Sequence, residues 1–311
     1  MAGAAAAVTA ELVKAEASAA GFDLCGIAPA TRLPELGFLD EWLARGYAGE
    51  MHYLQRTAAR RGDVREVLPS AQSVISLGVV YNAPRPYSVE CADPATAAIA
   101  RYAWGDDYHE IIGGRLERLL ERLRQSADFE ARAYVDTGPV QERVFARYAG
   151  LGWIGKNTCL INPELGSWIF LAAIICSLPL APDAPVLDHC GTCTLCLEAC
   201  PTGALVEPGV LDSTRCLSYL TIELKGAVPD AHRASIGAHA YGCDICQEVC
   251  PWNKFAKPHN ESRFDPSQQF KSLTENDWKD LTEEVFQKVF KNSPLKRTKY
   301  EGLKRNMRFL E

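Results

Sequence analysis

Cysteine spacing is the feature that most constrains what this sequence can fold into. A first motif, CxxCxxCxxxCP, consists of Cys190, Cys193, Cys196, Cys200 and Pro201. It is typical of bacterial ferredoxins, in which three closely spaced thiolates bind one four-iron four-sulfur cluster and the fourth binds a second cluster. A second motif, CxxCxxxCP, consists of Cys243, Cys246, Cys250 and Pro251, and Cys216 is the candidate for the thiolate that it lacks. The sequence therefore predicts two such clusters on eight of its 12 cysteines.

The exchange of fourth ligands that is usual in such proteins assigns the eight thiolates to two sets. The first cluster takes Cys190, Cys193, Cys196 and Cys250, and the second takes Cys200, Cys216, Cys243 and Cys246. A pair of zinc sites is the alternative, because CxxC pairs also bind zinc. Zinc ribbons, however, need neither the third cysteine of the first motif nor the proline after each motif. The remaining cysteines lack such spacing and are predicted to be ordinary thiols: Cys25, Cys91, Cys159 and Cys176.

The chain has more residues than two clusters need. With 311 residues, it is long enough for one large domain and a small cluster domain. Its composition, 47% hydrophobic and 23% charged, is that of a globular protein, and no apolar run has the length of a membrane span. The alanine-rich N-terminus lacks the basic start of an export signal, and the cytosol keeps thiols reduced. We therefore expect a cytoplasmic protein, without a membrane partner, whose cysteines bind metal.

The segment before the cysteine motifs alternates between strand and helix patterns. Apolar, β-rich runs predict buried strands at residues 71–82, 131–135 and 167–177. Leucines and isoleucines at helical spacing predict an amphipathic helix at residues 107–125, and a proline suited to a first turn predicts another at 139–148. The pattern indicates an α+β, or mixed α/β, fold.

A proline-rich connector at residues 178–188 marks a boundary between domains. The predicted parts are a catalytic domain (1–180), a ferredoxin-like domain with two clusters (181–255) and a basic helical segment (256–311). Residues 251–311 carry 13 Lys and Arg against 9 Asp and Glu, whereas residues 1–250 carry 20 against 30. The basic segment is either a solvated surface or a face that binds a polyanion.

Two further segments imitate known motifs without matching them. Residues 150–157 (GLGWIGKN) are close to a phosphate-binding loop, but Asn157 replaces the required Ser or Thr and a predicted helix precedes the segment. Asp107, His109 and Gly113 resemble a cobalamin-binding DxHxxG signature, but the glycine is one residue late and His109 falls inside the predicted helix. We therefore expect neither nucleotide hydrolysis nor cobalt ligation by His109.

Four segments together resemble the epoxyqueuosine reductase family. They are residues 135–143 (VDTGPVQER), 150–157 (GLGWIGKN), 215–223 (RCLSYLTIE) and 241–252 (YGCDICQEVCPW). The resemblance covers roughly residues 10–310 and includes all the predicted cluster ligands. It implies a cobalamin-dependent oxidoreductase, similar to reductive dehalogenases, with a nitroreductase-like domain, a bacterial-type diferredoxin domain and a short helical tail. The implied reaction reduces epoxyqueuosine to queuosine at the wobble position of a tRNA anticodon.

The resemblance also implies roles for particular residues. Asp136 matches the acidic residue that the family uses as proton donor, and this role requires burial to raise the pKa of its carboxyl. The alternative is that Asp136 only caps the helix expected from residue 139. By position in family-like motifs, the expected cobalamin contacts are Arg60, Asp136, Arg143, Asn157, Thr158, Ser218, Tyr219 and Gly242. The expected contacts with tRNA phosphates are Lys296, Arg297, Lys299, Lys304 and Arg305, with Arg143 and Lys156 as further candidates.

Electrons enter such an enzyme singly and are used in pairs. Each cluster passes one electron at a time, whereas loss of an epoxide oxygen as water takes two electrons and two protons, which a cobalt centre can combine. We expect an external low-potential electron donor as a further partner and a monomeric chain. Many members of the family continue into a helical-repeat domain that this sequence lacks, so we expect weaker tRNA binding. The alternatives are a cobalamin-dependent reductase similar to reductive dehalogenases and a non-catalytic electron carrier, which leaves residues 1–180 without a use.

Overall fold

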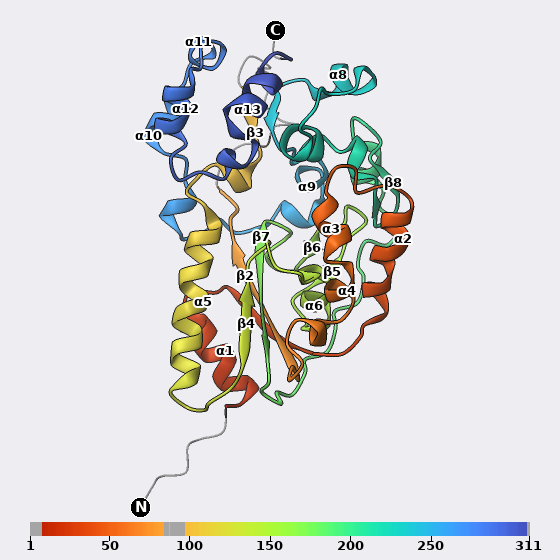
Figure 1. The fold of residues 1–311 in the computed structure, drawn as a ribbon, viewed down its shortest axis with the longest axis vertical. Coiled ribbons are helices and arrows are strands. Elements are labelled where there is room, and N and C mark those ends of the chain that lie inside the picture. The colour runs from red at the N-terminus through yellow and green to blue at the C-terminus, as the bar shows by residue number, and fades with distance from the viewer. Residues whose placement is uncertain (1–7, 84–86, 88–96, 310–311) are drawn as a thin grey trace, which may run out of the picture.

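The centre of the fold is a four-stranded antiparallel sheet with the strand order β1-β2-β7-β4. The computed structural model describes residues 8–83, 87 and 97–309, so the expected thiol of Cys91 lies outside the described residues. The strands are β1 (Leu24–Pro29), β2 (Ser73–Val80), β4 (Ala131–Tyr134) and β7 (Ile169–Cys176). All eight residues of β2 are buried, because helices cover both faces of the sheet (Figure 1).

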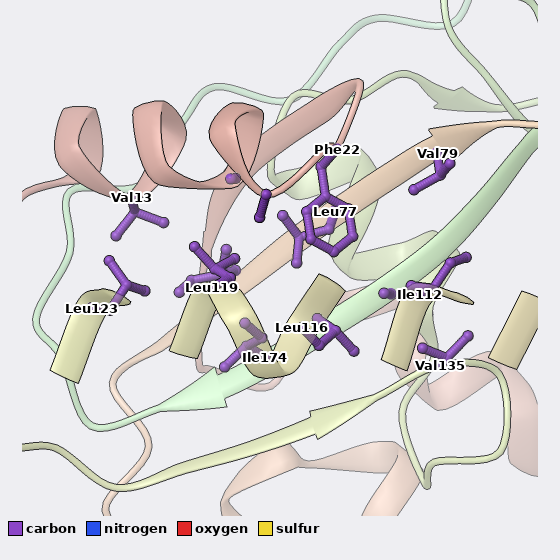
Figure 2. Close-up of a cluster of buried hydrophobic side chains, with 14 of the residues drawn as sticks. Val13, Phe22, Leu77, Val79, Ile112, Leu116, Leu119, Leu123, Val135 and Ile174 are labelled. Carbon is purple, nitrogen blue, oxygen red and sulfur yellow. The ribbon is translucent and has the colours of Figure 1, made fainter. Parts of the chain in front are cut away.

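Helices α1 (Ala10–Ala19) and α5 (Tyr108–Arg124) cover one face of this sheet. Figure 2 shows the resulting apolar cluster, which includes Val13, Leu77, Ile112, Leu116, Leu119, Leu123 and Ile174. Helix α5 begins after Asp107, whose carboxylate accepts a hydrogen bond from the backbone N–H of His109. This cap fixes His109 in the first turn of the helix.

The opposite face of the sheet is covered by α6 (Glu142–Tyr148), which packs against β1, β2 and β7. The prediction of a helix from residue 139 is wrong at its start. Residues 135–140 form a bend instead, and Arg61 holds its end by donating a hydrogen bond to the carbonyl of Val140. The other predicted elements are confirmed, since β2, β4, β7 and α5 lie within the predicted ranges.

Shorter elements complete the first half of the chain and the cysteine-rich part. The first half contains α2 (Phe38–Ala44), α3 (His52–Arg56), α4 (Ala58–Gly62), β5 (Trp153–Ile154) and β6 (Leu160–Ile161). The cysteine-rich part contains α7 (Leu195–Glu198), β8 (Leu205–Glu207), β9 (Val210–Leu211), α8 (Asp230–Ile236) and α9 (Ile245–Glu248), and residues Tyr219–Glu223 form a π-helical turn. Among the described residues, no helix is both long and apolar enough to span a membrane.

The C-terminal segment packs on a hydrophobic core of its own. Its helices are α10 (Gln268–Lys271), α11 (Glu275–Lys279), α12 (Glu283–Val289) and α13 (Lys299–Met307). Their buried side chains include Trp278, Phe286, Phe290, Leu295 and Leu303. This core also contains residues of β3 (Ala98–Ile99) and β10 (His239–Tyr241), two short strands that pair in parallel. This core therefore joins the C-terminal segment to short strands from two earlier parts of the chain.

Buried polar side chains also fasten the cysteine-rich part to the sheet domain. Asn253 is 1% exposed, and its side chain accepts a hydrogen bond from the backbone N–H of Ser167 and donates to the Ser167 hydroxyl. Asp244 is buried and accepts a hydrogen bond from the backbone N–H of Arg101 at 2.6 Å. Buried polar groups are stable when they are paired, so these contacts fix how the two parts are placed.

Candidate functional site

The eight cysteines of the motifs lie in two groups beside the sheet domain. The first group is Cys190, Cys193, Cys196 and Cys250, which together line a cavity of about 60 Å³. Lys156 and Trp252 also line this cavity. Three of the thiols come from the first motif and the fourth comes from the second, which is the exchange that the spacing predicts.

The second group is Cys200, Cys216, Cys243 and Cys246. Burial raises the pKa of the Cys243 thiol, and the neighbouring thiols Cys216 and Cys200 raise it further. A hydrogen bond with the Cys159 thiol raises the pKa of Cys246, so Cys159 lies against this group. Within the part of the chain that the structure describes, no three His, Cys, Asp or Glu side chains are placed to hold a single metal ion. The thiolates of a four-iron cluster do not need to converge on a single ion, because they bind different irons of the cluster.

The sulfurs of the motif cysteines accept hydrogen bonds from the protein, among them those of Cys190 and Cys200. The indole Nε1 of Trp153, a residue that is 1% exposed, donates to Sγ of Cys190 at 3.5 Å. The backbone nitrogen of Ala204 donates to Sγ of Cys200 at 3.2 Å. Donors of this kind stabilise a reduced cluster, because reduction adds negative charge that reaches the sulfur atoms. Each group of cysteines therefore has at least one such donor.

Lys156 and Asn157 join the cysteine groups to the sheet domain. The ammonium of Lys156 donates to the carbonyl oxygens of Gly191 and Cys193 at 2.7 and 2.9 Å. The amide of Asn157, which is buried, donates to the carbonyl oxygen of Cys246 at 3.1 Å. Lys156, a candidate for contact with tRNA phosphates, therefore uses its ammonium to hold the loop of the first cysteine group.

Three of the predicted cobalamin contacts come together at this junction. Thr158 follows Asn157 and has a φ of 65°, a region that β-branched residues rarely adopt. The guanidinium of Arg143, on α6, donates to the carbonyl oxygen of Thr158 at 2.6 Å. Arg143, Asn157 and Thr158 therefore form a continuous connection from α6 to Cys246.

The other predicted cobalamin contacts lie elsewhere in the fold. The hydroxyl of Tyr219 accepts a hydrogen bond from the backbone N–H of Glu50 at 2.8 Å, and Ser218 precedes it beside Cys216. Gly242 has a φ of 73°, and a Cβ atom there would lie 2.5 Å from Cβ of Ala100, so only glycine fits. Arg60 is exposed on α4.

Asp136 lies in the bend between β4 and α6. Its φ of 56° is uncommon for a residue other than glycine, and its backbone N–H donates to Oε1 of Glu142 at 2.9 Å. The side chain is 54% exposed, but the atoms packed around its carboxylate, including the imidazole of His109, still desolvate it enough to act on its pKa. Asp136 does not cap α6, because the residue that precedes this helix is Gln141. An exposed acid on a strained bend is typical of a functional site.

His109 is the nearest cationic side chain to Asp136. Its Nε2 lies 3.4 Å from Oδ2 of Asp136, and its Nδ1 lies 2.7 Å from Oδ1 of Asp107. Burial acts to raise the pKa of Asp136, but the contact with His109 and the charge of Arg297 outweigh burial and lower this pKa. The expectation of a raised pKa is therefore wrong, because it counted burial without the neighbouring cations. Burial acts to lower the pKa of His109, yet the two carboxylates raise it to about 9.

Sequence analysis missed other side chains of this site. The ring of Tyr108 stacks on that of His109 with centroids 4.1 Å apart. Burial and the charge of Asp136 raise the pKa of Glu142 to about 8. The Asp-x-His spacing at residues 107–109 is the signal in the sequence that points to this part of the site. A capping aspartate and the histidine two residues later lie in the same helical turn, so their side chains can meet.

The predicted tRNA contacts have different surroundings. Lys296, Lys299 and Lys304 are exposed. Arg297 forms an ion pair with Glu223 at 2.7 Å and also lies near Asp136, because its charge lowers the pKa of Asp136. The guanidinium of Arg305 instead donates to three backbone carbonyl oxygens of residues 220–226. Its hydrogen-bonding capacity is therefore used within the protein.

The arrangement fits the corrin cofactor that the resemblance implies. Such a cofactor carries many amide groups, which need polar partners. The site offers backbone in rare conformations at Asp136 and Thr158, and a buried Nε2 of His109 whose contact with Oδ2 of Asp136, at 3.4 Å, is long for a hydrogen bond. The connection from Arg143 to Cys246 runs beside it.

Two known families match separate parts of the chain. Residues 189–253 match a family described as a 4Fe-4S double cluster binding domain, and residues 61–137 match one described as Epoxyqueuosine reductase QueG, DUF1730. The first match favours two iron–sulfur clusters over a pair of zinc sites. The chain is 46% identical to the epoxyqueuosine reductase of Cellulophaga algicola over 97% of both chains. It is 45% identical to that of Synechocystis sp. over 86% of this chain and 92% of the relative.

Solved structures of the same family share the fold. A crystal structure of epoxyqueuosine reductase with an epoxyqueuosine-modified tRNA-Tyr stem loop has a TM-score of 0.83 and 32% identity, and the match covers 96% of this chain and 79% of that chain. A Bacillus subtilis structure, in which the catalytic aspartate loop has swung out of the active site, has a TM-score of 0.81 and 31% identity over the same shares. The predicted mixed α/β fold with a cluster domain and a helical C-terminal segment is confirmed. This chain therefore belongs to the epoxyqueuosine reductase family of oxidoreductases.

Proposed function

We propose that this chain reduces epoxyqueuosine to queuosine at the wobble position of a tRNA anticodon, using cobalamin that receives electrons from two four-iron four-sulfur clusters. The curated relatives are epoxyqueuosine reductases, and one solved relative holds an epoxyqueuosine-modified tRNA stem loop. The reaction removes the epoxide oxygen as water and consumes two electrons and two protons. An external low-potential reductant supplies the electrons.

The observation that carries this proposal is the short connection from the cysteines to the predicted acid. Asn157 binds the carbonyl of Cys246, and the next residue, Thr158, binds Arg143. Arg143 lies on α6, the helix whose first residue holds the bend of Asp136. The proposed cluster ligands, cofactor contacts and proton donor are therefore linked by a short series of contacts.

Each group of residues has a proposed task. The first cluster is bound by Cys190, Cys193, Cys196 and Cys250, and the second by Cys200, Cys216, Cys243 and Cys246. Cobalamin, when bound, supplies a metal that combines single electrons into a pair. Arg143, Asn157 and Thr158 would hold it beside the second cluster, together with Ser218, Tyr219 and Gly242. Asp136 delivers a proton to the oxygen that leaves.

The substrate and the setting follow from the same proposal. Exposed lysines of the C-terminal segment, Lys296, Lys299 and Lys304, are suited to bind tRNA phosphates, and Arg297 is placed to meet the RNA near Asp136. Recognition of a wobble base requires an unstacked nucleotide, which RNA loops provide. The enzyme acts in the cytoplasm, where tRNA is modified, and as a monomer, since one chain carries every proposed ligand.

An anaerobic assay tests the whole proposal. Cluster-loaded protein is mixed with cobalamin, a strong reductant and tRNA that carries epoxyqueuosine, and the nucleosides are analysed by mass spectrometry. We expect epoxyqueuosine to be replaced by queuosine, with no release of halide from an organohalide in a parallel reaction. Halide release without queuosine would favour a dehalogenase. Iron near eight atoms per chain without cobalamin uptake would favour an electron carrier, since about four irons belong to each cluster.

Replacing Trp153 with phenylalanine is expected to shift the reduction potential of the first cluster to more negative values. Phenylalanine keeps a ring against Trp252 but removes the N–H that donates to Sγ of Cys190. Loss of this donor weakens the stabilisation of the added electron. A redox titration followed by electron paramagnetic resonance measures the shift. Trp252→Phe is the control, because Trp153 remains as donor, and equal potentials in both variants would contradict the expectation.

A further inference from the structure

His109 lies between two carboxylates in the first turn of α5. Its Nδ1 lies 2.7 Å from Oδ1 of Asp107, and its Nε2 lies 3.4 Å from Oδ2 of Asp136. The contact with Asp107 places a proton on Nδ1, because a carboxylate only accepts. The other ring nitrogen, Nε2, therefore faces the carboxylate of Asp136.

The surroundings of Nε2 favour a protonated ring. This atom is buried, and it has no regular hydrogen-bond partner among the described residues, although it faces Oδ2 of Asp136 at ion-pair distance. A buried nitrogen without a partner is costly, whereas an imidazolium between two carboxylates is stabilised by both. The ring of Tyr108 stacks on the imidazole at a centroid distance of 4.1 Å, which restricts its rotation.

We propose that His109 stores the proton that Asp136 delivers to the substrate oxygen, with Asp107 holding the imidazole in place. His109 is a positioning residue in this account, because it acts through Asp136 and does not touch the substrate. The inference rests on the proposed function, since it needs an oxygen atom that leaves as water.

The alternative is that Asp107 and His109 form only a helix cap, because the carboxylate of Asp107 also accepts a hydrogen bond from the backbone N–H of His109. A cap alone does not explain the second carboxylate at Nε2. Other titratable and charged groups face the pair from the neighbouring elements: Tyr108 on α5, Tyr53 on α3, Arg61 on α4, Glu142 on α6, Tyr102, Tyr241 on β10 and Arg297 of the C-terminal segment.

Near neutral pH, the proton of this pair resides on the imidazole. The two carboxylates raise the pKa of His109 to about 9 against the effect of burial, and the contact with His109 lowers the pKa of Asp136. An ionised Asp136 has no proton of its own to give. The imidazolium of His109, whose Nε2 lies 3.4 Å from Oδ2 of Asp136, can supply the missing proton.

The transfer balances as a proton relay. The Nε2–H bond of His109 breaks and an O–H bond forms on Oδ2 of Asp136, and the same carboxyl then gives a proton to the epoxide oxygen as its C–O bond breaks. Asp136 ends ionised and His109 ends neutral. Solvent protonates His109 again, and the second proton of the reaction follows the same route. The two electrons come from the external reductant of the proposed function.

Two variants of the cluster-loaded enzyme test the relay through its pH dependence. In the wild type, the single-turnover rate of epoxyqueuosine reduction should fall as the pH rises through about 9. In His109→Asn, the rate at pH 7 should fall by about 10²-fold, and the alkaline limit should move to lower pH. Asp107→Asn should shift the limit in the same direction by less, because asparagine still caps α5 but carries no charge. His232→Asn, on α8, is the control and should leave the profile unchanged.

A second measurement does not depend on the substrate. Nuclear magnetic resonance of histidine-labelled, oxidised protein follows the titration of His109, whose signal is identified by its absence in His109→Asn. We expect titration near pH 9 in the wild type and at lower pH in Asp136→Asn. Titration below pH 7 in the wild type, or an unmoved alkaline limit in His109→Asn, overturns the inference. A wild type that titrates near 9 but never forms queuosine instead rejects the proposed function.

Discussion

Replacing Asp136 with asparagine is expected to lower the rate of epoxyqueuosine reduction by about 10²- to 10⁴-fold, which is the usual contribution of a proton donor. Asparagine has the same shape and tolerates a positive φ, so it can keep the bend at a φ of 56°. It carries no carboxyl proton and cannot pass one on from His109. Single-turnover kinetics with nucleoside mass spectrometry measures the loss.

The variant must also retain its cofactors for this result to concern the proton. We expect its iron content to equal that of the wild type, because the described contacts of Asp136 involve no cysteine, and its cobalamin content to be unchanged, because asparagine keeps a polar side chain of the same shape. Asp128→Asn is a matched control, since Asp128 is exposed beyond the far end of α5. Turnover of Asp136→Asn at the wild-type rate would remove Asp136 from the mechanism.

Replacing Cys216 with alanine is expected to abolish activity and to lower the iron content from about eight to about four atoms per chain. Cys216 stands outside both motifs, yet it lies near Cys200 and Cys243, whose charges affect one another. Without it, the second cluster lacks its fourth ligand while the first keeps all of its own. Iron analysis and the absorbance of the clusters measure the loss after anaerobic preparation.

Cys159 offers a demanding control for this prediction. Its thiol lies against that of Cys246 and is partly buried, but it belongs to neither set of proposed ligands. Cys159→Ala should therefore keep about eight iron atoms per chain. Loss of a cluster in Cys159→Ala, with retention in Cys216→Ala, would exchange the assignment of these two residues.

The sequence was most informative where the constraint is local. The spacing of the cysteines and the apolar run of β2 are visible in the residues themselves, because a ligand set or a buried strand needs its residue types within a few positions. The thiols also lie in two groups, whose assignment as ligands of two clusters stays a prediction. The family resemblance supplied Asp136, since nothing in its spacing separates a proton donor from a cap.

The electrostatics of Asp136 could not be predicted in this way. His109 is 27 positions earlier in the chain, and only the packing of α5 beside the bend brings the two side chains within 3.4 Å. Burial alone suggests a raised pKa, and the neighbouring cation reverses the sign. The late start of α6 has a similar cause, because the bend is held by contacts with Arg61 and Glu142 rather than by helical hydrogen bonds.

Among the described residues, β3 pairs only with β10, which leaves the ribosome some 140 residues later. The core around this pair also needs Phe290 and Leu303, so it closes only when nearly the whole chain has been made. Contacts so distant in sequence form slowly. Both cysteine motifs therefore leave the ribosome before this core can close.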